Sequence, residues 1–155
     1  MLRDDTAAAQ FSDFIREVEP RLRRALTAGF GSEVGREATA EALAYAWQHW
    51  ERIKSMGNPA GYLYRVGQGK ARRMRPLRVI ADRSRFTSSD VWFEPALESA
   101  LAGLTHQQRT VVALVHAFDW SFAEVANLMG VTKSTVQSYE KRAMEKLQRA
   151  LGVRR

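Results

Sequence analysis

The stretch of sequence that decides the fold runs from residue 121 to residue 148 and reads SFAEVANLMGVTKSTVQSYEKRAMEKLQ. Apolar residues recur at three- and four-residue steps on both sides of Met129-Gly130-Val131, which predicts two helices joined by a tight turn. Gly130 can adopt the left-handed backbone conformation of such a turn without steric cost. Ser121 and Thr132 are residue types that cap the start of a helix. The pattern is typical of a helix-turn-helix.

The second helix of this pair carries a polar and basic face. In a DNA-reading helix-turn-helix this helix lies in the major groove, where its N-terminal amides and cations bind phosphates and its polar side chains reach base edges. The side chains available on this face are Lys133, Ser134, Gln137, Ser138, Lys141 and Arg142. An ordinary helical hairpin with a solvated face is the alternative. The caps, the small Ala126 at the helix crossing and the turn glycine stand in register, which favours DNA binding.

Outward from this pair, helical periodicity continues to the N-terminus and no convincing strand pattern occurs. We expect helices from about residue 11 to Gly29, from Glu33 to Ile53, and from Pro59, with Asn58 as its cap, to about Pro76. Two further helices precede the decisive stretch, a short one ending near Gly103 and one capped by Thr105 that reaches Phe118. Trp47 and Trp50 follow an apolar stripe, and we expect both in the core.

The helix that follows Pro59 combines cations with aromatic neighbours. It carries Arg65, Lys70, Arg72, Arg73 and Arg75 and lies near Trp47, Trp50, Tyr62 and Tyr64. Cations that bind phosphates, together with flat rings that stack on bases, suit single-stranded DNA. The alternative is a solvated basic face beside core aromatics.

The expected fold is all-α, with two small helical domains joined by a flexible linker. The apolar pattern lapses between residues 77 and 93, so we assign residues 1–76 to the first domain, 77–93 to the linker and 94–155 to the second domain. Within the linker, Val91-Trp92-Phe93 is expected to pack locally or on the second domain. That second domain contains the helix-turn-helix.

Charge and composition narrow the class of protein. The chain has 155 residues and a formal net charge of +7, which attracts polyanions such as nucleic acid or an anionic membrane. Residues 1–80 carry 14 Lys/Arg against 9 Asp/Glu and residues 101–155 carry 8 against 4, whereas residues 81–100 carry 2 against 4. Two basic segments around an acidic middle are consistent with two nucleic-acid contacts. There is no signal-peptide core and no membrane-length apolar run, so we expect a cytoplasmic protein without membrane insertion.

The sequence gives little support for an enzyme. It has no cysteine, and His49, His106 and His116 do not stand at metal-ligand spacing. A glycine-rich phosphate loop and a nucleophile elbow are both absent from the sequence. We therefore expect no catalytic residues, no metal site and no cofactor.

Taken together, these segments resemble the extracytoplasmic-function (ECF) group of bacterial sigma factors. The second half matches at Phe122-Ala123-Glu124-Val125-Ala126, Met129-Gly130-Val131 and Thr135-Val136-Gln137-Ser138, preceded by Leu104-Thr105 and Arg109. Pro59-Ala60-Gly61-Tyr62-Leu63-Tyr64-Arg65-Val66 is similar to the first-domain segment, with Tyr62 in place of the common tryptophan. Ala40 and Gly69 also depart from the pattern, since the group usually has glutamine and asparagine there.

The resemblance implies a transcription-initiation function and a set of contact residues. Glu37 and Glu41 would contact the clamp of core RNA polymerase. The upstream, minus-thirty-five duplex would be read by Thr132, Lys133, Ser134, Thr135, Gln137, Ser138, Lys141 and Arg142. The minus-ten element would be held by Lys54, Met56, Asn58, Arg65, Gln68, Lys70, Arg72 and Arg73, with a flipped base in the 54–58 loop. The expected partners are core RNA polymerase, promoter DNA, and an anti-sigma factor or other regulatory protein.

Two alternatives from other classes stay open at this point. One is a conventional activator or repressor that binds duplex DNA through its helix-turn-helix. The other, suggested by Ala40 and Gly69, is a degenerate sigma-like protein that acts through protein contacts. Core polymerase binding separates the first from a sigma factor, and promoter opening separates the second.

Overall fold

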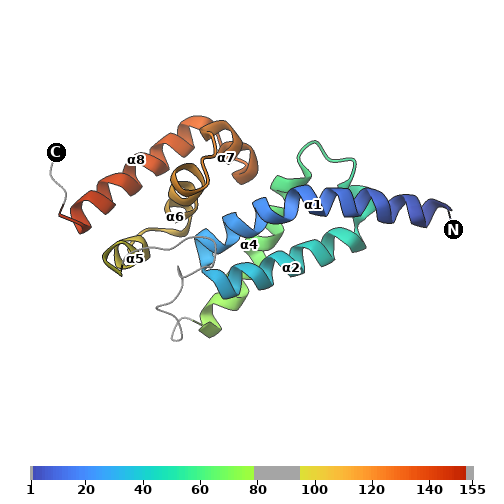
Figure 1. Cartoon of the computed structure of the whole chain (residues 1–155), viewed down its shortest axis with the longest axis horizontal. Coiled ribbons are helices and arrows are strands. Elements are labelled where there is room, and N and C mark those ends of the chain that lie inside the picture. Colours follow the sequence, from blue (N-terminus) through green and yellow to red (C-terminus); the bar gives the residue numbers. More distant parts are fainter. Residues whose placement is uncertain (1, 79–94, 153–155) are drawn as a thin grey trace.

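The structure is a computed structural model that describes residues 2–78 and 95–152. The expected linker 77–93, including Val91-Trp92-Phe93, lies almost entirely outside the described residues. Within them the chain is all-α, and no strand occurs. The helices form two groups, one from each half of the chain, that lie against each other (Figure 1).

The first half is built from two long antiparallel helices and a third that packs across them. Its elements are α1 (Leu2–Phe30), α2 (Ser32–Gln48), the short α3 (Trp50–Ile53) and α4 (Pro59–Arg78). α1 continues through Pro20, whose missing N–H costs one backbone hydrogen bond, because Val18 and Leu22 on either side of it are buried in the core. Gly31, with a φ of 95°, ends α1 as expected.

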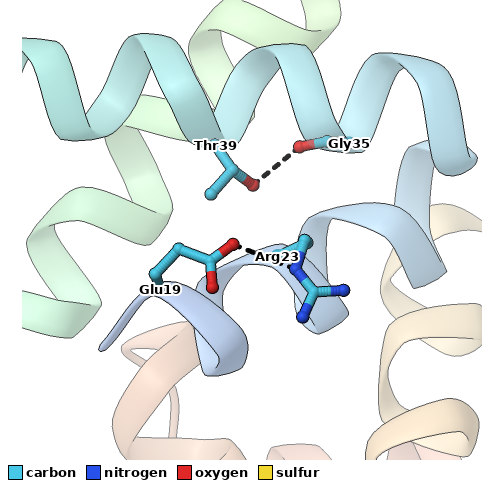
Figure 2. A network of polar contacts seen from close by, with 4 residues as sticks. All are labelled: Glu19, Arg23, Gly35 and Thr39. Atoms are coloured by element: carbon cyan, nitrogen blue, oxygen red, sulfur yellow. Dashed lines mark hydrogen bonds and ion pairs between the residues drawn. The ribbon is translucent and has the colours of Figure 1, made fainter. Parts of the chain in front are cut away.

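Figure 2 shows where α1 and α2 run side by side. Thr39 is buried, and its hydroxyl donates to the Gly35 carbonyl at 2.6 Å, so it satisfies its polar group within its own helix. On α1, Arg23 and Glu19 form an ion pair at 2.9 Å, one turn apart. The aliphatic part of this interface is made by Leu22, Ala25, Leu26, Ala38 and Ala42.

Two expectations about helix ends in the first half are wrong. The predicted 33–53 helix is interrupted at His49, whose φ and ψ of −119° and 26° leave the helical region, and α3 starts in a new direction. The change of direction buries Trp50, whereas Trp47, also expected in the core, is 49 % exposed and lies against Phe11. α4 also continues two residues beyond Pro76, because a proline near the end of a helix removes only one backbone hydrogen bond there.

The second half comprises α5 (Pro95–Ala102), α6 (His106–Val112), a π-helical turn η1 (Ala113–Ala117), α7 (Phe122–Met129) and α8 (Lys133–Ala150). The expected helix from Thr105 to Phe118 is present, but its last part is π-helical. The main core runs through both halves of the chain: Leu63 and Tyr64 of α4 belong to the same buried cluster as Val111 of α6 and Val125 of α7. A smaller cluster joins α5 to α8.

Candidate nucleic-acid interface

The turn between α7 and α8 has the geometry that the sequence predicts. Ser121 accepts a hydrogen bond from the Glu124 N–H at 3.1 Å, and the Glu124 carboxylate accepts one from the Ser121 N–H at 3.2 Å, which completes a capping box. Gly130 ends α7 in the left-handed conformation, with a φ of 69°. These local bonds fix the angle at which α8 leaves the turn.

The start of α8 is closed by a cluster of hydroxyl groups. The Thr132 hydroxyl accepts from the Thr135 N–H at 3.1 Å and lies 2.8 Å from the Thr135 hydroxyl and 3.1 Å from that of Ser134. Thr135 is half-buried as a result, so its place is mainly structural. The other expected contact residues are exposed along one helix, namely Thr132, Lys133, Ser134, Gln137, Ser138, Lys141 and Arg142.

The opposite face of α8 anchors it to the rest of the second half. Val136, Ala143 and Leu147 are buried, and Tyr139 packs against the main core. At the edges, the Glu140 carboxylate lies 3.1 Å from His116 Nε2, and Lys146 donates to Gln108 at 3.1 Å. α8 is therefore a rigidly seated helix that presents a polar face with Lys133, Lys141 and Arg142 as its cations, which is the arrangement a major-groove helix requires.

The expected minus-ten residues lie on α4 and the loop before it, but they are not equally available. Arg65, Arg72 and Arg73 are exposed. Lys70 lies 4.0 Å from Glu41, so one expected DNA-binding cation neighbours one expected polymerase-binding acid. Lys54 pairs with Glu51 at 2.9 Å, within the loop region.

Three of the expected minus-ten residues already have protein partners. Met56 packs against the main core. Gln68 donates to the Tyr64 hydroxyl at 3.2 Å. Asn58 caps α4 by accepting from the Gly61 N–H at 3.0 Å, which confirms its predicted capping position, and its amide also donates to the Asn127 carbonyl of α7 at 2.6 Å.

The expected aromatic neighbours of the basic helix divide into buried and accessible rings. Trp50 and Tyr64 are buried and cannot stack on a base in this structure. Burial raises the pKa of Tyr64 to about 12, so its hydroxyl stays protonated. Tyr62 and Trp47 are the expected rings that remain at least partly accessible.

A polar aromatic cluster beside α4 was not singled out by the sequence. Tyr45 of α2 and Tyr62 of α4 have their hydroxyls 3.1 Å apart, and Arg52 donates to Tyr45 at 2.7 Å. The hydrogen bond from Tyr62, assisted by the Arg52 charge, holds the pKa of Tyr45 below its usual value. Only the aromatic types at these positions hinted at the cluster, because the break at His49 that turns Arg52 toward them was not predicted.

Within the described residues, no group of His, Asp and Glu side chains is placed to hold a metal ion. No helix in the described ranges is long and apolar enough to cross a membrane. The charged face of α8 and the basic side of α4 are thus the prominent polar features of these ranges.

Comparison with known proteins agrees with this geometry. Residues 95–147, about a third of the chain, match the family model described as Sigma-70, region 4. No curated protein sequence gives a significant match. Among solved structures, the chain is similar to the sigma factor RpoE in a co-crystal structure with the anti-sigma factor NepR from Bartonella quintana. The TM-score is 0.60 and the sequence identity 21 %, over 94 % of this chain and 99 % of that one.

The two findings cover complementary parts of the molecule. The family match falls on α5 to α8, which contain the capped helix-turn-helix, and the structural likeness extends to the first half. A lone helix-turn-helix domain would leave α1 to α4 without a counterpart. The chain is therefore a member of the sigma-70 family, with residues 95–147 as its region 4 and the fold of a sigma factor over the whole chain.

Proposed function

We propose that this chain is an alternative sigma factor of the ECF type, which binds core RNA polymerase and directs it to promoters. The observation that carries the proposal is the match of region 4 to a helix-turn-helix whose recognition helix, α8, exposes a polar, basic face. The role is one of binding and requires no catalytic residue of its own. It places the protein in the cytoplasm with RNA polymerase.

In this proposal the two halves bind different forms of the promoter. The exposed face of α8 reads the upstream duplex, with Lys133 at the phosphates and Gln137, Ser138 and Lys141 at base edges. Arg65, Lys70, Arg72 and Arg73 of α4 hold the opened strand, and the 54–58 loop takes a flipped base. The domain bounds proposed for these roles are residues 1–76 and 94–155.

Glu37 and Glu41 of α2 are the proposed contacts to the polymerase clamp. Both side chains are exposed. The solved relative was crystallised with an anti-sigma factor, and we propose that a regulatory protein of that kind also binds this chain.

Binding to core polymerase tests the proposal most simply. The purified chain should co-elute with core polymerase in size-exclusion chromatography, and a Glu37→Ala/Glu41→Ala variant should lose most of this complex. Asp13→Ala/Glu17→Ala, which removes two exposed acids from α1, is the matched control and should bind normally. If the chain binds duplex DNA but never core polymerase, it is a conventional regulator instead.

A further inference from the structure

The loop to which we assign the flipped minus-ten base is occupied by the protein itself. The Asn58 amide donates to the backbone carbonyl of Asn127 at 2.6 Å and lies 3.4 Å from its side-chain oxygen. Asn127 stands near the end of α7, the first helix of the helix-turn-helix. The donor group that would recognise a base therefore already has acceptors, and they come from the other half of the chain.

The contact extends from this loop along α4. Arg65, an expected strand-binding cation, lies against the turn of the helix-turn-helix so closely that a Cβ on Gly130 would be 2.3 Å from its guanidinium. One side of α4 faces α7 over this length (Figure 1). A nucleic-acid strand cannot occupy this side of the loop while α7 is there.

A second contact, between the end of α1 and α6, holds the halves together. Arg109 of α6 is buried, and its guanidinium donates to the Gly29 carbonyl of α1 at 2.8 Å. Gly29 has no room for a side chain, since a Cβ there would lie 2.8 Å from the Thr110 hydroxyl oxygen. The rings of Phe30 and His106 stack beside it with centroids 5.1 Å apart.

Cation–aromatic pairs extend this contact along α1. The Arg24 guanidinium lies 4.9 Å from the Phe118 ring centre, and that of Arg21 lies 4.9 Å from the Trp120 ring centre. Each pair joins α1 to the segment that follows η1. Such pairs contribute roughly 0.5–1 kcal/mol at exposed sites. The two halves are thus joined by specific contacts at both ends of the interface.

We propose that these contacts make a closed, self-inhibited state of the free chain, in which α7 blocks the minus-ten loop until the halves separate. The proposal rests on the proposed function for the role of that loop. The face of α8 that reads duplex DNA stays exposed in the closed state, so only the minus-ten half of promoter recognition is blocked. Core polymerase opens the chain by binding the separated form more tightly, which shifts the population.

Energy transfer between two dyes measures the closed state directly. The chain has no cysteine, so Glu17→Cys on α1 and Glu145→Cys on α8, both exposed, can be labelled selectively. The free chain should show one high-transfer population, and adding core polymerase should convert it to low transfer. A free chain with mostly low transfer would overturn the proposal.

A pair of glycine substitutions separates interface effects from general damage. Gly29→Ala favours the helix locally but inserts a Cβ against Thr110, so it should lower the transfer efficiency of the free chain. Gly69→Ala is the matched control, because nothing but the tip of Arg73 comes within 4.0 Å of its Cβ. Equal transfer in both variants and the parent would contradict the assigned contact.

A reversible cross-link tests whether closure is inhibitory. Asn58→Cys/Asn127→Cys can be bridged by a short bis-methanethiosulfonate reagent and released by reductant. The same variant should transcribe with core polymerase after reduction and at least tenfold less while bridged. If it cannot be bridged, or transcribes equally in both forms, the proposal fails. Absence of transcription in the unmodified parent would instead count against the proposed function, and the dye experiment would still decide whether the chain is closed.

Discussion

At the scale of single residues, Arg109 has the largest structural role. Its side chain is 3 % exposed, and its guanidinium donates to the Leu104 carbonyl within the second half and to the Gly29 carbonyl of the first. A guanidinium carries several donors in a fixed geometry, so one side chain can satisfy carbonyls at the ends of two elements. The sequence pattern marked Arg109 as typical of the family but gave no reason for it.

Replacing Arg109 with Ala should lower the free energy of unfolding by about 3 kcal/mol, because hydrogen bonds from a charged donor are lost and buried carbonyls are left without it. Urea unfolding followed by circular dichroism would measure the loss. Arg142→Ala, an exposed arginine on α8, should change stability by less than about 0.5 kcal/mol. Similar midpoints for the two variants would show that the buried bonds contribute little.

Glu124 gives a prediction about pH. Hydrogen bonds from the Ser121 backbone and side chain hold the pKa of this carboxyl below its ordinary value of 4.5. The folded pKa is lower than the unfolded one, so the carboxylate stabilises the fold above the unfolded pKa, and this contribution disappears as pH falls through the folded pKa. Glu124→Gln should therefore melt at a lower temperature than the parent at neutral pH and at the same temperature near pH 3. A gap that persists unchanged in acid would refute the assignment.

At the scale of elements, the local signals of the sequence were enough for the second half. Ser121, Thr105 and Thr132 each cap the helix they were expected to cap, and Gly130 takes its left-handed conformation. These are interactions within four residues, so their cause lies in adjacent sequence. The errors lie where distant packing decides: His49 breaks a continuous periodic pattern because Trp50 is drawn into the core.

The α8 face makes an element-scale prediction about specificity. Gln137→Ala should cost roughly 1–3 kcal/mol and relax selectivity at one base pair of the upstream element. Lys133→Ala should weaken binding on all sequences and reduce the salt dependence by about one unit of slope. Competition between promoter variants for the polymerase-bound protein would measure both. If the two substitutions gave the same uniform loss, α8 would not be reading bases.

At the scale of the whole molecule, the sequence predicted two helical groups but not how they meet. The contacts between Asn58 and Asn127, and between Gly29 and Arg109, join residues about 70 to 80 positions apart in the chain. Neither periodicity nor capping carries information over that separation. For the same reason Tyr64, placed by pattern among the DNA-facing rings, is buried in the core that the halves share.

The central claim, that this chain is a sigma factor, is tested most directly by transcription. Core RNA polymerase would be supplied with the purified chain and fragmented genomic DNA, and the start sites of the RNA would be mapped. We predict start sites that share an upstream and a minus-ten motif and that vanish with Glu37→Ala/Glu41→Ala. Duplex DNA binding without any chain-dependent start site would contradict the claim.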